Sequence, residues 1–389
     1  MPDPERTIYL DNAATSHPKP PEVAEAIVAH LERRNANPGR SGHRRSIDAA
    51  RTVHEAREAI AALFGLADPL RVVLTANATE SLNLALFGLL APGDHVVTSA
   101  VEHNSVMRPL RALEAEGVTS TAVPCDPDGT LDPTEIDRAI RPATKGIVLT
   151  HASNVVGTIL PIREAGRIAR DRGLLLLVDA ATTAGAQPID VDRDGIDLLA
   201  ITGHKGLLGP TGTGALLLGD RVDAETMRPL KHGGTGSRSE EEQQPPFLPD
   251  RFEAGTLNAA GLAGLTAGIG WIRERGIDAI RARQVEAVRR LIDGLMAIGG
   301  VRVHGTKNAE RQMAPVSITI EGLPPSEIGR RLDADFGILC RVGLHCAPSA
   351  HRAFGTFPDG TVRLAPGVFT TDEEIDATLL AVDRIAGTR

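Results

Sequence analysis

Residues 174–218 decide the fold class, and they read LLLLVDAATTAGAQPIDVDRDGIDLLAITGHKGLLGPTGTGALLL. The stretch contains three apolar runs that each fit a strand buried on both faces, a feature typical of parallel sheets. The first run ends at Asp179, and the second passes into Lys205 within a glycine-containing turn. Ligands of open parallel sheets bind outside the carboxyl ends of the strands. We therefore expect an acid and an amine to face one bound molecule there.

This acid and amine suit pyridoxal 5'-phosphate (PLP). A lysine forms a Schiff base with the aldehyde of PLP, and a carboxylate beside the pyridine nitrogen keeps that nitrogen protonated. Burial beside apolar strands would lower the pKa of Lys205 and favour its neutral, nucleophilic amine. Taken alone, the pattern leaves two simpler interpretations open. Lys205 would then be a solvated turn residue, and Asp179 a helix cap.

Size, charge and cysteine content narrow the class of protein. A chain of 389 residues favours two domains. A net charge of -8, without a long run of Lys and Arg, argues against nucleic-acid binding. No apolar stretch approaches the length of a membrane span and the start, MPDPERTIYL, lacks a signal-peptide core, so we expect a cytoplasmic protein. The three cysteines cannot all pair and are not spaced as a metal site.

The order of expected elements predicts an α/β fold. Helical periodicity covers residues 21–34 and 47–64, and strands alternate with helices from residue 72 onward. Such repeated units predict a mostly parallel central sheet with helices on both faces. A polar segment, residues 231–258, is expected to be a long loop. Beyond it we expect a smaller α/β domain with helices near 257–275, 277–298, 326–332 and from 372, and strands at 315–320 and 361–364.

Other polar residues follow predicted strands. Ala78 and Thr79 open a helix, where free amides and the helix dipole favour a phosphate, although Thr79 could simply cap the helix. His103, His151 and His204 also follow predicted strands, either as catalytic groups or as structural side chains.

The smaller domain offers two further candidates. Cys346 follows His345 in a predicted loop, where a reactive thiolate would be favoured, although free cysteines are more often small buried hydrophobes. Arg363 lies alone in an apolar strand and could bind a substrate carboxylate or form a structural ion pair.

Eight segments together establish a resemblance to a known family. They are YLDNAATS, ATESLN, EHNSVMRPL, HASNVVGT, VDAA, TGHKGLLGPTGTG, RFEAGTLN and RVGLHCAP, in that order along nearly the whole chain. The sequence resembles the cysteine desulfurase and selenocysteine lyase group of the class V aminotransferase superfamily. This resemblance implies PLP-dependent transferase fold type I and a homodimer. It also implies a large domain at 18–255 and a small domain formed by 1–17 and 256–389, which carries the catalytic cysteine loop.

The resemblance also implies a role for each matched residue. Lys205 would carry the Schiff base, Asp179 would meet the pyridinium nitrogen, and His103 would stack on the ring and transfer protons. Cys346 would be the nucleophile that takes sulfur from L-cysteine as a persulfide, leaving alanine. The remaining expected contacts are Ala78, Thr79, His204 and the second subunit's Thr256 with the phosphate, and Asn154 and Arg363 with the substrate carboxylate.

One position departs from the pattern of the family. The chain has Thr182 where desulfurases often have a glutamine that meets the phenolic oxygen of the cofactor. Because the side chain of Thr182 is shorter, the sequence leaves several substrates and reactions as alternatives. Selenocysteine lyase is the nearest alternative, and PLP-dependent C-S lysis, transamination or epimerisation are others. A non-enzymatic sulfur-trafficking scaffold is a further alternative, and a sulfur-acceptor protein is a possible partner.

Overall fold

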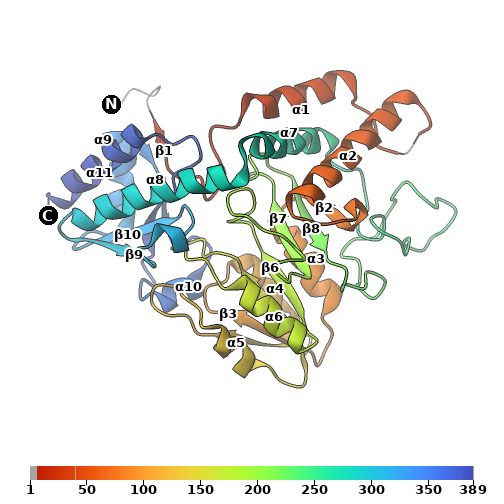
Figure 1. Cartoon of the computed structure of the whole chain (residues 1–389), viewed down its shortest axis with the longest axis horizontal. Coiled ribbons are helices and arrows are strands. Elements are labelled where there is room, and N and C mark those ends of the chain that lie inside the picture. The colour runs from red at the N-terminus through yellow and green to blue at the C-terminus, as the bar shows by residue number, and fades with distance from the viewer. Residues whose placement is uncertain (1–6, 40, 389) are drawn as a thin grey trace.

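A seven-stranded sheet forms the centre of the molecule in the computed structural model, which describes residues 7–39 and 41–388 (Figure 1). The strand order is β2 (Val72–Thr75), β8 (Gly214–Leu218), β7 (Leu198–Thr202), β6 (Leu175–Asp179), β5 (Thr144–Thr150), β3 (His95–Ser99) and β4 (Thr119–Val123). All neighbouring strands are parallel except β8, which runs antiparallel to β7 and β2. The prediction of a mostly parallel central sheet is confirmed.

Helices cover both faces of this sheet. Along β6, Leu176 and Val178 face one hydrophobic cluster and Leu177 faces another, as expected for a strand without a solvent-exposed side. The first cluster includes residues of α2 (Arg44–Leu63), α5 (Pro133–Ala139), α6 (Ile162–Asp171) and α7 (Ala259–Arg275). The second includes residues of α3 (Ala78–Leu89) and α4 (Asn104–Glu114). α1 (Pro21–Arg33) packs on α7 at the periphery (Figure 1).

A second, antiparallel sheet lies in the C-terminal part of the chain. Its order is β12 (Arg341–Gly343), β13 (Thr361–Leu364), β10 (Val316–Ile320) and β9 (Val301–His304). The long helix α8 (Ile277–Ala297), with α9 (Pro325–Phe336) and α11 (Asp372–Ala386), shares one hydrophobic cluster with these strands. The N-terminal strand β1 (Ile8–Tyr9) pairs with β11 (Ile338–Leu339), so the segment that begins at residue 7 joins the C-terminal region (Figure 1). The domain boundaries at 17/18 and 255/256 stay a prediction.

The remaining elements and the long loop complete the comparison with the sequence. The short elements are α10 (Pro348–Ala353) and two 3-10 turns, η1 (Pro69–Arg71) and η2 (Ala309–Arg311). No helix or strand occurs in residues 219–258, all of which are described, so the expected loop is longer than residues 231–258. The expected loop at residues 341–348 begins instead with the short strand β12, which depends on its pairing with β13. No described helix combines the length and the apolarity that a membrane crossing requires.

Candidate active site

A polar cavity of ≈ 210 Å³ lies at the carboxyl ends of several strands of the central sheet. Asp179 is the last residue of β6, Lys205 follows β7, and Arg363 reaches the cavity from β13 of the second sheet. The structure therefore brings together residues that the sequence placed at separate strand ends. The predicted residues that line this cavity are Ala78, Thr79, His103, Asn154, Asp179, Thr182, His204, Lys205 and Arg363.

Asp179 is a buried carboxyl with little local compensation. It is 4% exposed, and its Oδ1 accepts a hydrogen bond from the Ala181 N–H at 2.9 Å. No described basic side chain forms an ion pair with it. Burial raises the pKa of Asp179, while the Ala181 N–H and the nearby Lys205 charge act in the opposite direction. A buried carboxylate of this kind is stabilised by a cationic group placed in the cavity.

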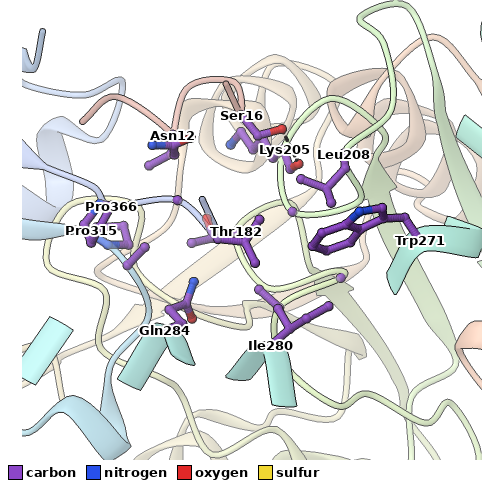
Figure 2. Close-up of a pocket in the computed structure, with 17 residues that line it drawn as sticks. Asn12, Ser16, Thr182, Lys205, Leu208, Trp271, Ile280, Gln284, Pro315 and Pro366 are labelled. Atoms are coloured by element: carbon purple, nitrogen blue, oxygen red, sulfur yellow. Dashed lines mark hydrogen bonds between the residues drawn. The ribbon is translucent and has the colours of Figure 1, made fainter. Parts of the chain in front are cut away.

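The Lys205 turn is held by close backbone packing. A Cβ on Gly206 would lie 2.5 Å from the Ala184 carbonyl oxygen, so a larger residue would push the two turns apart. Ser16 Oγ donates to the Lys205 carbonyl at 2.8 Å and ties the N-terminal segment to the same turn (Figure 2). Desolvation lowers the pKa of Lys205 to about 8, despite the opposing effect of Asp179. A neutral amine is therefore accessible close to neutral pH.

His103 is a neutral histidine with a defined tautomer. It precedes α4, and its Nδ1 accepts the backbone N–H of Ser105 at 3.0 Å. That bond assigns the ring proton to Nε2. Desolvation, followed by the charges of Lys205 and Arg341 among others, lowers the pKa of His103 to about 4. The ring is thus available as an uncharged surface that exchanges protons through Nε2.

The N-terminus of α3 forms one end of the cavity. Asn77 caps this helix by accepting the Glu80 N–H at 3.0 Å, so Thr79 does not act as the cap. The amides of Ala78 and Thr79 are among the first of the helix and have no intrahelical acceptor. The Thr79 hydroxyl is linked to Ser105 Oγ at 2.7 Å. Free amides, a hydroxyl and the positive helix end form an anion-binding arrangement.

His204 and Thr182 flank the lysine. Desolvation lowers the pKa of His204 to about 4, and its buried Nδ1 has no hydrogen-bond partner among the described residues. Thr182 lines the polar cavity and also a second, largely apolar cavity, and Lys205 lines both. Figure 2 shows this second cavity, with Trp271 and Ile280 opposite Pro315.

Arg363 and Asn154 join the two sheets beside the cavity. Arg363 is 1% exposed, donates from Nη1 to the Asn154 carbonyl at 2.9 Å, and forms an ion pair with Asp11 at 2.8 Å. Its Nε and the Asn154 side-chain oxygen are buried without partners among the described residues. Arg363 therefore makes a structural ion pair and keeps a donor for a ligand, so the two interpretations from the sequence are compatible.

Cys346 lies on a loop attached to the cavity wall. All three cysteines are free, and Cys346 is the exposed one. The Asn104 N–H donates to the Cys346 carbonyl at 2.8 Å, and Asn154 Nδ2 donates to the His345 carbonyl at 2.6 Å. The residue before Cys346 lines the cavity, although Cys346 itself does not. The thiol thus lies beside the site and open to solvent.

Thr256 is a predicted residue that this single chain places away from the cavity and from its wall. It is exposed and lies with Arg57 and Glu253 at a different surface hollow. Arg57 and Glu253 form a buried ion pair close to this loop, with Arg57 Nη1 and Glu253 Oε1 2.7 Å apart. The predicted contribution of Thr256 to a second subunit's site stays a prediction.

Several site residues were missed from the sequence. Arg341 lines the cavity, Asp11 pairs with Arg363, and Ser105 orients His103. Glu102 is fully buried and accepts the Thr150 N–H at 2.9 Å, which fixes the residue before His103 to the end of β5. The segments YLDNAATS, EHNSVMRPL and RVGLHCAP contained these residues, but the sequence carried no signal for their pairings.

The chain belongs to a known family. The chain is a member of the class-V aminotransferase family, whose model, Aminotransferase class-V, matches residues 8–378. This family is PLP-dependent.

Two similar proteins are both described as probable cysteine desulfurases. A probable cysteine desulfurase of Methanothermobacter thermautotrophicus is 35% identical over 98% of this chain and 95% of its own length. A probable cysteine desulfurase 2 of Mycobacterium leprae is 34% identical over 97% of this chain and 91% of its own length.

A solved structure agrees with these relatives. The apo structure of a cysteine desulfurase from Thermococcus onnurineus has a TM-score of 0.92 and 34% identity, covering 98% of this chain and 95% of that chain. The fold of this chain is therefore that of the cysteine desulfurases.

Proposed function

We propose that the polar cavity binds PLP through Lys205. The cavity offers an amine whose pKa is lowered to about 8, a buried carboxyl without a cationic partner, and a helix N-terminus with free amides. These groups match the aldehyde, the ring nitrogen and the phosphate of PLP, respectively. The unpartnered polar atoms of His204, Asn154 and Arg363 are further candidates for ligand contacts. The residues present therefore fit the cofactor of the family.

We propose that the chain is a cysteine desulfurase that converts L-cysteine to L-alanine. Bound PLP would supply a ring that accepts electrons from the substrate α carbon. Lys205 Nζ would then move the α proton, and His103 would lie against the ring in its neutral form. Arg363 Nε and Asn154 would hold the substrate carboxylate.

Cys346 would receive the sulfur. Its thiolate attacks the sulfur of the substrate, the carbon–sulfur bond breaks, and the carbon fragment takes up a proton to become alanine. One thiol and one cysteine thus give one persulfide and one alanine, so atoms and electrons balance. Storing sulfur on the enzyme divides one difficult step into two. The exposure of Cys346 would let a sulfur-acceptor protein reach the persulfide.

The proposal extends to assembly and location. The exposed Thr256 loop would reach the phosphate in a second copy, which makes a homodimer the working form. A cytoplasmic location fits a chain with three free thiols, because glutathione and thioredoxin keep protein thiols reduced in the cytosol.

The observation that carries the proposal is that Lys205, Asp179 and the loop of Cys346 meet at one cavity. The test is to incubate purified protein with L-cysteine and measure alanine, sulfide and enzyme-bound persulfide. Cys346→Ser should lower alanine formation by about 10²-fold or more and abolish the persulfide, while the visible absorbance of the cofactor stays.

Cys125→Ser is the matched control, because burial raises the pKa of that thiol to about 12 and it should not react. Unchanged sulfur release by Cys346→Ser would contradict the proposal. Parallel turnover with selenocysteine tests the nearest alternative substrate.

A further inference from the structure

The sulfur of Cys346 contacts a guanidinium group. Arg341 Nη2 lies 3.5 Å from Cys346 Sγ, and no other side chain among residues 7–39 and 41–388 forms a hydrogen bond with this sulfur. Arg341 also lines the polar cavity, together with Lys205 and Arg363. The guanidinium therefore extends from the cavity to the thiol beside it.

The backbone of the loop fixes this contact. After β12, His345 and Cys346 adopt φ values of 47° and 59°, which are uncommon for residues with a side chain. Two consecutive left-handed residues turn the chain sharply, which allows the sulfur to contact the first residue of β12. The carbonyls of both residues are held by donors from the segments that follow β3 and β5. Residues other than glycine at positive φ beside a cavity are typical of functional positions.

Arg341 differs from the arginine beside it in its charge balance. Arg341 and Arg363 occupy paired positions of β12 and β13. Arg363 is neutralised by Asp11, whereas no described carboxylate lies within ion-pair distance of Arg341. The charge of Arg341 contributes to lowering the pKa of both Lys205 and His103. The cavity thus contains an uncompensated cation whose contact on one side is a sulfur atom.

We infer that Arg341 stabilises the Cys346 sulfur as an anion, first as the thiolate and then, after sulfur transfer, as the terminal sulfur of the persulfide. The second half of this inference rests on the proposed function. Ionisation releases one proton to solvent and needs no oxidant or reductant. A thiolate next to an arginine is the nucleophilic form of cysteine. Arg341 would therefore touch the reacting atom.

The test compares alkylation of Cys346 by iodoacetamide in four holoenzymes at neutral pH. They are the wild type, Arg341→Gln, Arg341→Lys and the control Arg352→Gln. Iodoacetamide is uncharged, so attraction of the reagent by arginine does not contribute. Arg352 is exposed, stacks on Phe357 and does not line the cavity. Peptide mass spectrometry separates Cys346 from Cys125 and Cys340, whose pKa values burial raises to about 12.

Cys346 should be alkylated about threefold more slowly in Arg341→Gln than in the wild type, because less of it is ionised. The effect is modest for two reasons: a partly exposed charge contributes little, and the thiolate that Arg341 stabilises is less basic and therefore a weaker nucleophile. Arg341→Lys and Arg352→Gln should keep the faster rate. Added salt should slow the wild type more than Arg341→Gln, in which the charge of Arg363 still acts on the thiol.

Equal rates in the wild type and Arg341→Gln would overturn the inference, as would a slow Arg341→Lys. Alkylation does not depend on turnover. A failure of the proposed function, seen as undiminished sulfur release by Cys346→Ser, would therefore be distinguishable from a failure of this inference.

Discussion

Two turns carry the two groups that we propose to react, Lys205 and Cys346, and they are built differently. The Lys205 turn follows a strand buried on both faces and packs backbone against backbone through Gly206. The Cys346 turn follows a strand of three residues, exposes Cys346, and places two side-chain-bearing residues at positive φ. The first arrangement fixes an amine within a site, and the second presents a thiol to solvent. We infer that the central sheet holds the cofactor and that the second sheet presents the sulfur.

Removing the amine of the first turn should have the largest effect. Lys205→Ala should lower alanine formation by about 10³-fold or more, because it removes the proposed attachment point and the proton carrier together. It should also lose the visible absorbance of bound cofactor, which Cys346→Ser should keep. Lys145→Ala is the control, because Lys145 is exposed on β5. A fully active Lys205→Ala would contradict the proposal that the first turn supplies the amine that binds the cofactor.

Disturbing the packing of the first turn should have an intermediate effect, which is on the stability of the protein. Gly206→Ala should lower the free energy of unfolding by about 1–3 kcal/mol, because its Cβ would meet the Ala184 carbonyl oxygen at 2.5 Å. Chemical denaturation of the holoenzyme measures this change. Gly270→Ala, where a Cβ would meet no atom within 4 Å, should be neutral or stabilising. If both variants unfold alike, the turn is not tightly packed.

A smaller effect is expected from pH on the rate at which PLP attaches to Lys205. Because the pKa of Lys205 is lowered to about 8, its amine is mostly charged below that pH and mostly neutral above it. The rate of PLP attachment to the apoprotein should therefore rise about tenfold between about pH 7 and pH 9 and then level off. Stopped-flow absorbance follows this rate. A rise that continues towards the ordinary pKa of a lysine, 10.5, would show that burial does not tune this amine.

The first turn was more predictable from sequence than the second. Three buried runs and the residues at their ends predicted the central sheet and the meeting of Asp179 with Lys205, because parallel strands end at one edge. β12 is too short to show periodicity, and pairing with β13 defines it. The residues around Cys346 indicated only a candidate reactive thiolate, and its role as the sulfur-accepting nucleophile came from the resemblance.

Pairings between distant segments could not be predicted from the sequence. Asp11 and Arg363 are 352 residues apart and meet because β1 joins the C-terminal region. The contact of Arg341 with Cys346 is local, but it depends on a left-handed turn formed by residues other than glycine. Propensity rules favour His over most residues at positive φ, but they do not place Cys in such a turn. These contacts arise from tertiary structure, so only the three-dimensional structure identifies them.

The most direct test of the central claim is to locate the cofactor on the chain. The protein is loaded with PLP, reduced with borohydride, digested and analysed by mass spectrometry. Lys19 is an internal comparison, because desolvation also lowers its pKa to about 8 while its Nζ donates to the His204 carbonyl at 2.9 Å. We predict a pyridoxyl adduct on the peptide containing Lys205 and not on Lys19. An adduct on another lysine, or none, would contradict the account.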